Sequence, residues 1–412
     1  MRLLFAHHQS LYAKVILPLA WYFAGQGHEV AYHINRPQFL GWSWGFSQGS
    51  IRRHPTTVGI VNPQALRYVA RLIDYERQWE ELRGRLRYHR GKRYGGYDAV
   101  VATTKDLPWL REVAAEWKVP AFAVGYQHLP FVARVDGGFA LPDEAPEVTS
   151  LFLSEHPFAQ AHGVSEIFQG YALRACSFLY LDRVHARVAG GGQAGEEAQS
   201  GGVPAAEPAS PPRPLAFLFH PGGYRGVVTQ FGEGKAACYA KQKVFLERLC
   251  LPLIEAGFRV VIKIHPLRAR HHDLADVQAI FADIARERRL PSGCVEWLGP
   301  EAWYWESAFR SRVILTFGSS SIYELWSAGL RNVYVCNFEG KARSEKFSFF
   351  ESIFLDSYAA YLKRIEAWAG AEATACRETD PVTDEVFRAY SCLFTGRAVE
   401  TAYRLITHEI SA

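Results

Sequence analysis

The stretch from Thr316 to Val335 reads TFGSSSIYELWSAGLRNVYV, and it contains the order of elements that decides the fold. A β-branched run at 313–316 leads into a glycine and three serines, a helical pattern follows at about 321–329, and a second apolar run begins at Asn332. This order predicts a strand, a loop, a helix and a second strand, which is the βαβ unit of a parallel sheet. One serine is enough to cap a helix, so three consecutive hydroxyls raise the question of an anion-binding loop.

The same alternation runs through the second half of the chain. Strand-like runs at 215–220, 259–265 and 295–299 alternate with helical patterns at 236–256, 273–287 and 301–310. The first half shows it too. Strands are predicted at 2–8, 28–34, 97–103 and 119–126, and helices at 12–26, 63–90 and 106–117. Strands that alternate with helices predict parallel sheets covered by helices.

A segment at 188–213 separates the two halves. Gly, Ala, Pro, Ser and Glu dominate it, so we expect a disordered and dispensable linker. The predicted fold class is α/β, with two Rossmann-like doubly wound domains facing across a cleft. The expected divisions are an acceptor-side domain at 1–187, the linker at 188–213, a nucleotide-sugar domain at 214–380, and a helical segment at 381–412 that packs back on the first domain.

Composition narrows the function classes. The chain has 412 residues, 49% of them hydrophobic and 21% charged, so it can bury sizeable cores. The formal net charge of +4 is spread without long basic blocks, and no nucleic-acid partner is expected. Seven scattered cysteines favour a reducing compartment. The expected location is cytoplasmic, because no apolar run reaches about 18 residues, the length typical of a membrane span. Peripheral association with the inner face of the cell membrane stays open.

Polar residues follow three strands of the second half, and the carboxyl ends of parallel strands meet at one rim where ligands bind. The residues after these strands are His220, Gly222, Gly223 and Arg225; Lys263, His265 and Pro266; and Gly318, Ser319, Ser320 and Ser321. A helix N-terminus with flanking hydroxyls suits a phosphate. Glu324 either closes a capping box with Ser321 or accepts hydrogen bonds from ribose hydroxyls. The plain alternative is a well-capped helix without a ligand.

Glu233 lies between glycines on the loop after the first strand of this half. It is either a base or nucleophile beside a sugar, or a solvated loop residue. In the first half, the candidates for the acceptor side follow strand-like runs: His8, Gln127, His128, Glu155 and His156. The tryptophans at 297, 303 and 305 are more simply explained by core packing than by base stacking.

Several common site motifs are missing from the sequence. It contains no P-loop, no G-x-G-x-x-G after a strand and no H-E-x-x-H. It also contains no Asp-x-Asp pair, which argues against a sugar-nucleotide enzyme that depends on a metal held by such a pair. We therefore expect neither a metal nor a cofactor.

The sequences KIHP at 263–266 and GSSSIYE at 318–324, in a chain of two α/β halves, carry a resemblance to a known superfamily. The chain resembles the metal-independent GT-B glycosyltransferases that use cytidine-activated donors. These include the β-Kdo transferases of capsule and lipopolysaccharide assembly, the bacterial polysialyltransferases and, more distantly, the teichoic-acid glycerophosphotransferases. The resemblance is concentrated in about 220–340. It implies that His265 and Pro266 lie by the cytidine nucleotide and that the three serines hold its phosphate.

The resemblance also implies a function. It predicts a glycosyltransferase that moves a 2-keto acid sugar from a CMP donor to a bacterial surface polysaccharide or lipid-linked glycan. The β-Kdo enzymes use an aspartate nucleophile, and the corresponding loop here offers Glu233. Together with the residues singled out at the strand ends, this predicts Glu233, His265 and His220 as catalytic. Lys263 and Glu324 are expected at the nucleotide site, and Gly222, Gly223 and Arg225 at the donor-sugar site. The alternatives are a UDP-sugar epimerase, a CDP-glycerol-type glycerophosphotransferase and a non-catalytic glycan-binding module.

Overall fold

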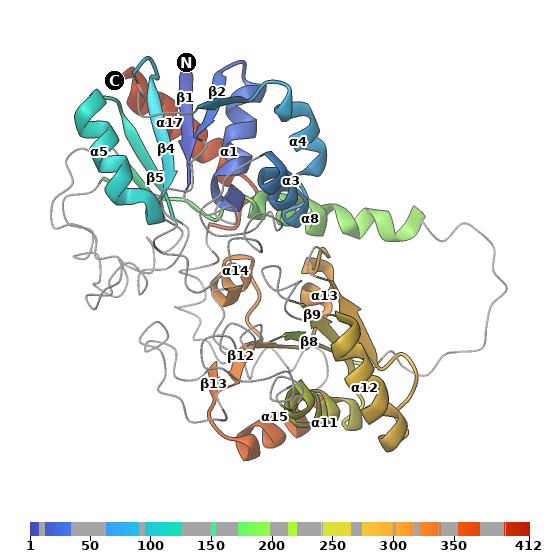
Figure 1. The fold of residues 1–412 in the computed structure, drawn as a ribbon. Helices are drawn as coiled ribbons and strands as arrows, with labels where there is room; N and C mark the ends of the chain where they lie inside the picture. Colours follow the sequence, from blue (N-terminus) through green and yellow to red (C-terminus); the bar gives the residue numbers. More distant parts are fainter. Residues whose placement is uncertain are drawn as a thin grey trace. The chain divides into compact units, whose positions relative to one another are not determined.

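The computed structural model describes residues 1–7, 13–33, 63–89, 95–125, 150–153, 172–197, 213–220, 240, 242–264, 274–299, 302–316, 321–336, 338, 353–370, 391 and 393–412. Figure 1 follows the chain through them. The chain divides into two compact units. The first consists of Met1–Arg187, Trp326–Gly329 and Asp384–Ala412, and the second of Val188–Leu325 and Leu330–Thr383. Each unit is built on its own parallel sheet.

Within the described residues, the sheet of the first unit has seven parallel strands in the order β3-β2-β1-β4-β5-β6-β7. The strands are β1 (Arg2–Ala6), β2 (Glu29–His33), β3 (Arg87–His89), β4 (Ala99–Thr103), β5 (Ala121–Val124), β6 (Ser150–Leu153) and β7 (Leu173–Ala175). Leu3, Leu4 and Phe5 of β1 are all fully buried, as expected for a central strand covered on both faces. The predicted strands at 2–8, 28–34, 97–103 and 119–126 are confirmed.

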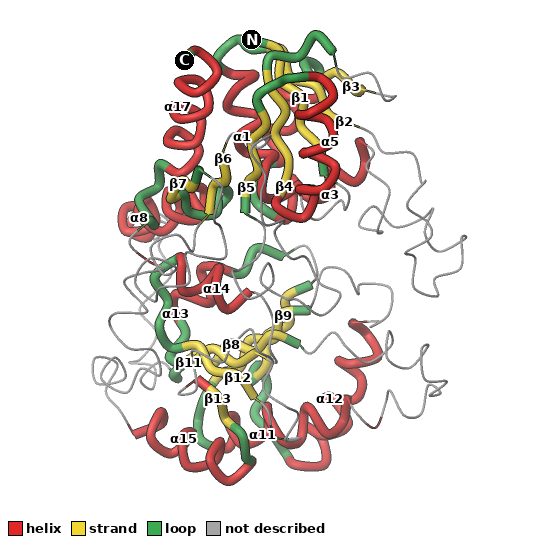
Figure 2. Tube along the Cα trace, turned by 90° about the vertical axis from the view of Figure 1, so that its left-hand side faces the viewer, coloured by secondary structure: helices red, strands yellow, loops and turns green. Residues whose placement is uncertain are grey.

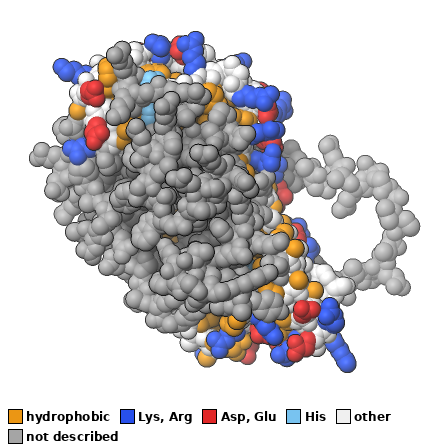
Figure 3. Space-filling view, in the orientation of Figure 1, with side chains coloured by type: hydrophobic (Ala, Val, Ile, Leu, Met, Phe, Trp, Pro, Cys, Tyr) orange, Lys and Arg blue, Asp and Glu red, His pale blue; other side chains and the backbone are white. Residues whose placement is uncertain are grey.

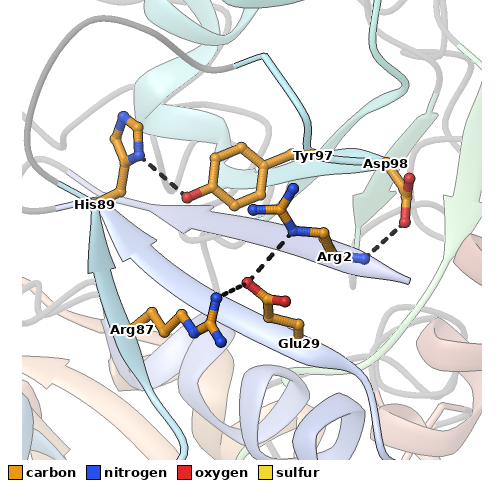
Figure 4. A network of polar contacts seen from close by, with 6 residues as sticks. All are labelled: Arg2, Glu29, Arg87, His89, Tyr97 and Asp98. Atoms are coloured by element: carbon orange, nitrogen blue, oxygen red, sulfur yellow. Dashed lines mark hydrogen bonds and ion pairs between the residues drawn. The ribbon is translucent and has the colours of Figure 1, made fainter.

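Charged residues fix the register at the starts of these strands, as Figure 4 shows. The backbone N–H of Arg2 donates to Asp98 Oδ2 at 2.7 Å. The Glu29 carboxylate accepts from Arg87 Nη1 at 2.7 Å and lies 3.4 Å from Arg2 Nε. These contacts join β1, β2 and β3 to the turn before β4 at the end of the sheet where the strands begin. These contacts therefore do not occupy the carboxyl ends of the strands.

The C-terminal helix completes the first unit. Helix α17 (Ala398–Ser411) packs against α1 (Ala13–Gly25), and the two lie side by side in Figures 1 and 2. Tyr403 of α17 contacts the ring of Phe23, with centroids 4.8 Å apart. Asp182, in the first turn of α8 (Leu181–Glu197), accepts hydrogen bonds from the backbone N–H groups of Ala398 and Val399, each at 2.8 Å. One carboxylate thus satisfies two donors at the start of α17.

Within the described residues, the sheet of the second unit has six parallel strands in the order β10-β9-β8-β11-β12-β13. They are β8 (Leu215–Phe219), β9 (Arg259–Lys263), β10 (Val295–Leu298), β11 (Val313–Thr316), β12 (Val333–Cys336) and β13 (Phe354–Leu355). Its helices include α12 (Leu274–Arg288), α13 (Trp305–Arg310), α14 (Ser321–Ser327) and α15 (Tyr358–Gly370). The α/β fold class with two parallel sheets is confirmed, and so is the βαβ unit predicted from Thr316–Val335.

The helical segment before β9 changes geometry where a proline enters. The π-helical turn η5 (Leu246–Cys250) precedes α11 (Leu251–Glu255), and Pro252 lies at the start of α11. Proline has no N–H to donate to the carbonyl four residues earlier, so a wider turn accommodates the missing bond. The prediction of one regular helix at 236–256 is corrected to this extent. Leu249, Cys250 and Leu253 still face the core of the second unit.

The single helix predicted at 63–90 is wrong. The structure has α3 (Pro63–Leu72), α4 (Glu76–Arg83) and then β3. Asp74 adopts a left-handed backbone conformation with φ of 58°, which ends a right-handed helix. Its carboxylate contacts Arg183 Nε at 3.1 Å and Arg187 Nε at 2.9 Å. These ion pairs to α8 stabilise a conformation that the local sequence does not specify.

The start of the predicted linker is also corrected. Helix α8 continues to Glu197, ten residues into the segment 188–213. Once a helix has formed, each added residue gains one hydrogen bond at little further cost. Helix α8 therefore extends into a segment whose composition alone predicts a linker. Residues 198–212 lie outside the described residues, and their dispensability stays a prediction.

The described surface carries charges of both signs. On the face seen in Figure 3, basic and acidic side chains lie close together. Elsewhere in the described part of the chain, Arg77 Nε lies 3.6 Å from Glu81 Oε1 and both side chains are exposed. In the part of the chain that the structure describes, no helix combines the length and the apolar character that a membrane crossing requires.

Replacing Asp182 by Ala tests the junction between α8 and α17. The two backbone donors lose their acceptor, so we expect the free energy of unfolding to fall by about 0.5–2 kcal/mol, the usual cost of removing a helix cap. Asp182→Asn should lose less, because its amide oxygen still accepts one bond. The control Glu81→Gln breaks an exposed pair and should change stability by less than about 1 kcal/mol. Urea unfolding measures all three, and an equal loss in Asp182→Ala and the control would contradict the capping role.

Candidate functional site

The strand order of the second sheet reverses between β8 and β11. The chain runs from β8 through β9 to β10 on one side, and from β11 through β12 to β13 on the other. In parallel sheets, ligands bind outside the carboxyl ends of the strands at such a switch point. His220 directly follows β8, Lys263 ends β9 and Thr316 ends β11. Because these three strands are neighbours, the predicted convergence of His220 and Lys263 on one rim is what the topology produces.

Contacts with three other residues fix the position of His220. Its side chain is 3% exposed, and its Nε2 lies 2.6 Å from Oε1 of Gln242, which is 4% exposed. The ring meets the edge of Phe245 with centroids 5.1 Å apart. Its backbone N–H donates to the carbonyl of Lys263 at 3.0 Å, which extends the pairing of β8 with β9 by one residue. The imidazole is therefore fixed in place at the end of the strand.

Lys263 places a buried ammonium group at the same rim. The residue is 4% exposed, and Nζ donates to the carbonyls of Ile264 at 2.9 Å and Gly299 at 2.8 Å. These carbonyls come from the loops after β9 and β10. A charge removed from water gains more from a nearby opposite charge than an exposed one does. Lys263 is thus suited to attract an anionic ligand to these strand ends.

Glu324 and Ser321 come from α14, the helix that follows β11. Glu324 is 7% exposed although it is charged. Burial raises the pKa of the nearby Tyr304 phenol well above its ordinary value, and the charge of Glu324 adds to the effect. Helix α14 begins at Ser321, and the capping box predicted for Ser321 and Glu324 stays a prediction. With seven residues, the helix is too short for its dipole alone to define an anion site.

Aromatic residues pack beside β8. Tyr304 contacts Phe217 and Phe219 with centroids 5.8 and 5.4 Å away, and it stacks on Trp305 at 4.9 Å. Trp305 is 3% exposed, and Trp297 packs edge-on against Phe281 of α12. The interpretation of these tryptophans as core residues therefore holds for both positions.

Most residues predicted for the site lie outside the described residues, and their roles stay predictions. On the donor side these are Gly222, Gly223, Arg225, Glu233, His265, Pro266, Gly318, Ser319 and Ser320. On the acceptor side they are His8, Gln127, His128, Glu155 and His156. The described members of the predicted set are His220, Lys263, Ser321 and Glu324.

The first sheet has its own switch point, between β1 and β4. His7 follows β1, is 1% exposed and lies edge-on to Tyr32 with ring centroids 5.6 Å apart. At the end of β4, Thr103 Oγ1 donates to Asp106 Oδ2 at 2.5 Å, and both residues are buried. The sequence interpretation missed Asp106. The sequence signal that could have identified Asp106 was the group of polar residues at the end of an apolar strand.

Two histidines end neighbouring strands of this sheet. His33 of β2 is in register with His89 of β3, and their rings lie 5.8 Å apart. The His33 ring also stacks on Trp109, from the first turn of α5 (Leu107–Trp117), at 5.5 Å. His89 Nδ1 is 3.1 Å from the Tyr97 hydroxyl, as Figure 4 shows. These aromatic rings make the carboxyl ends of β2 and β3 suitable for contact with a polar ring. The sequence interpretation missed them.

Groups of three or more His, Cys, Asp or Glu residues arranged to hold a metal do not occur among the described residues. The expectation that no metal is required stays a prediction. The cysteines that the structure describes, Cys176, Cys250, Cys294 and Cys336, are buried free thiols.

Solved structures of other proteins resemble this chain in fold. The chain resembles the wall teichoic acid polymerase TagF with a TM-score of 0.53 and 9% identity, over 100% of this chain and 89% of that one. It resembles the Glycyrrhiza uralensis protein UGT73P12, complexed with glycyrrhetinic acid 3-O-monoglucuronide, with a TM-score of 0.51 and 11% identity, over 100% and 96%. The chain has the GT-B fold. In sequence, neither a family model nor a curated protein matches it.

Replacing Lys263 by Met tests whether the ammonium group also supports this rim. The substitution keeps much of the side-chain volume but leaves the carbonyls of Ile264 and Gly299 without their donor. We expect the free energy of unfolding to fall by about 1–3 kcal/mol, the cost of an unsatisfied buried polar group. Lys243→Met is the matched control, because Lys243 is only partly buried and its pair with Glu247, at 3.7 Å, should contribute at most about 1 kcal/mol. Indistinguishable urea midpoints for the two variants would contradict a structural role for Lys263.

Proposed function

We propose that the protein is a glycosyltransferase that binds a nucleotide-activated sugar at the carboxyl ends of β8, β9 and β11. The observation that carries this proposal is the placement of His220, Lys263 and Glu324 beside one switch point of a parallel sheet. The GT-B fold agrees with this choice, since UGT73P12, which shares it, was solved with a glycoside. The fold by itself does not assign the chemistry.

The groups at this rim match the parts of a nucleotide. The ammonium of Lys263 and the serines before α14 offer hydrogen-bond donors to phosphate oxygens. The buried carboxylate of Glu324 is an acceptor for the two ribose hydroxyls. His220 supplies an imidazole at the end of β8, between these groups in the strand order. A nucleotide presents both an anion and a diol, and so engages all of them.

Cytidine monophosphate is the proposed nucleotide, and its support is the resemblance carried by KIHP and GSSSIYE. In a CMP-sugar the phosphate is attached directly to the anomeric carbon. When that bond breaks, the electron pair stays with the phosphate oxygen, and Lys263 and the serine hydroxyls stabilise the developing charge. The proposed donor sugar is a 2-keto acid sugar.

The acceptor is proposed to be a bacterial surface polysaccharide or a lipid-linked glycan. Its hydroxyl oxygen forms a new bond to the anomeric carbon, and its proton leaves to a basic side chain. Glu233 is the proposed base or nucleophile, with His220 and His265 assisting the departure of CMP. In the first unit, the rings at His33, His89 and Trp109 add a surface for the acceptor to the positions already predicted.

A second candidate function takes support from one of the structural neighbours. TagF is a wall teichoic acid polymerase, and the resemblance noted from sequence includes glycerophosphotransferases of that pathway. Transfer of a phosphate-containing unit from a CDP-linked donor would use the same rim. CDP-glycerol and a CMP-sugar should therefore be compared as donors in the same assay.

A thermal-shift screen of CMP, CDP, UDP and GDP identifies the nucleotide. We expect CMP to raise the melting temperature most, because a ligand that binds only the folded state stabilises it by mass action. Turnover of CDP-glycerol, in which the glycerophosphate unit is transferred and CMP leaves, would favour the second candidate over a CMP-sugar. Incubation with UDP-GlcNAc alone, followed by a search for the epimer, separates both from an epimerase. A protein that no nucleotide stabilises would contradict the proposal.

Replacing the serines at 319–321 by alanine separates phosphate binding from helix capping. If the hydroxyls bind phosphate, we expect CMP affinity to weaken by about 0.5–1.5 kcal/mol for each neutral hydrogen bond lost, and by up to about 3 kcal/mol where charge is engaged. Loss of a cap alone should lower stability by about 0.5–2 kcal/mol and leave affinity unchanged. Isothermal titration calorimetry and urea unfolding of the same variant measure both. Unchanged CMP affinity in a destabilised variant would refute the phosphate role.

Transfer activity should survive chelation of divalent metals. We expect turnover of a CMP-sugar to be the same with and without EDTA, because the cationic and hydroxyl groups of the rim replace a metal in neutralising the phosphate. The measurement is the release of CMP over time. Loss of activity in EDTA and its recovery with manganese would contradict this expectation.

A further inference from the structure

His28, the residue directly before β2, lies where the first sheet meets the C-terminal helix α17. Its Nδ1 is 3.2 Å from the nitrogen of Met1, and its Nε2 is 3.2 Å from the hydroxyl of Tyr403 in α17. The backbone N–H of His28 donates to the Phe23 carbonyl at 3.1 Å, which attaches the residue to the end of α1. Both nitrogens of the imidazole therefore have partners, and these come from different elements.

Two aromatic rings pack around the same imidazole. The ring of Phe23 lies 5.5 Å from it and the ring of Tyr403 5.9 Å, measured between centroids. Phe23 and Tyr403 also contact each other, with centroids 4.8 Å apart. The three side chains form one group, the His28 cluster, which joins α1, α17 and the start of β2. The contacts that dock α17 on α1 thus also shield the partly buried imidazole from water.

The partner of Nδ1 determines which protons the ring carries. A protonated amino group or a peptide N–H donates and does not accept, so Nδ1 accepts from the Met1 nitrogen. The single proton of a neutral imidazole is then on Nε2, and it is donated to the Tyr403 hydroxyl. A second proton would have to be added at Nδ1. It would break the bond to Met1 and place two donors against each other.

The charged groups near the His28 cluster do not compensate for a cationic ring. Helix α1 contains no acidic residue. On α17, Glu400 is paired with Arg404 of the same helix. The Glu29 carboxylate, next in the chain, is shared between Arg2 and Arg87. Among the described residues, no carboxylate is a partner of the imidazole itself.

This environment favours the neutral form of the docked ring. Burial lowers the pKa of His28 below its ordinary value of 6.5, and the charge of the Met1 amino group lowers it further. An imidazole released from the cluster takes up its proton at the ordinary value, so acid favours the released form. The contribution of His28 to docking is therefore complete above pH 6.5 and is lost as the pH falls through 6.5 towards the lower pKa of the docked ring.

We propose that His28 makes the docking of α17 on α1 sensitive to acid. While the ring is neutral, it connects the Met1 nitrogen to the Tyr403 hydroxyl. Once the ring is protonated at Nδ1, the bond to Met1 is lost and the imidazole is more stable in water than between Phe23 and Tyr403. Release of the ring removes a shared partner of α1 and α17. This inference goes beyond the proposed function and does not depend on it.

The ¹⁵N NMR spectrum of histidine-labelled protein tests the state of the ring. The His28 signals, assigned by their loss in His28→Gln, should show a protonated Nε2 and a Nδ1 without hydrogen near neutral pH. Their titration midpoint should lie below 6.5. A neutral ring with its proton on Nδ1 would overturn the proposal, and so would a midpoint at or above the ordinary value.

Hydrogen exchange of the backbone amides in α17 measures the docking. Mass spectrometry follows it at about pH 7.5 and about pH 5.5, with correction for the intrinsic effect of pH on exchange. In the wild type, the protection of residues 398–411 should be lower at the acid pH by roughly twofold or more. His28→Gln does not titrate, and its amide can still donate to Tyr403, so most of this difference should disappear. His28→Asn, whose amide oxygen can accept from Met1, should behave in the same way.

His408→Gln is the matched control, because His408 is an exposed histidine in the last turn of the same helix. A protonated histidine at that position stabilises the C-terminus of the helix, so its removal should leave the acid-induced loss of protection in place. Equal losses in the wild type, His28→Gln and His28→Asn would overturn the proposal. A loss that disappears in His408→Gln and persists in both His28 variants would overturn it as well.

Discussion

The pairing of β8 with β9 on one side and β11 on the other is the interaction on which the second unit depends. Because all three strands are parallel, their carboxyl ends meet at one rim, and because the chain order reverses between β8 and β11, the loops after them diverge there. The rim therefore collects residues far apart in the sequence. His220 extends the β8–β9 ladder by one hydrogen bond, so the polar site is continuous with the sheet that supports it.

The polar groups at this rim are buried. A lysine, a histidine and a glutamate are each less than a tenth exposed, an arrangement that is unfavourable unless partners compensate for the lost hydration. For Lys263 the partners include two backbone carbonyls, and for His220 the amide oxygen of Gln242. These groups keep fixed positions before any ligand arrives. A nucleotide bound at the proposed site would therefore cost little conformational entropy of these side chains.

The sequence predicts those parts of the fold that depend on residues close together in the chain. The apolar runs of β1, β8 and β11 predict strands, and their fully buried residues show why no polar alternation marks them. The left-handed Asp74 and the extension of α8 to Glu197 depend on tertiary contacts or on helix propagation, which a window of residues does not contain. The partnership of His220 with Gln242 likewise joins two elements. His220 and Lys263 were predictable because each directly follows or ends an apolar strand, whereas Gln242 lies within a helix without any distinguishing pattern.

The docking of α17 on α1 has a consequence for how the protein is made. The first unit contains the beginning of the chain and its last helix, with the second unit between them. During synthesis, α1 emerges early, and much of its apolar surface waits for a partner that is translated nearly four hundred residues later. The second unit is complete before the first, which reverses the usual N-terminal-first order of domain folding. The apolar face of α1 that α17 covers therefore stays exposed on a nascent chain until residues 398–411 have been synthesised.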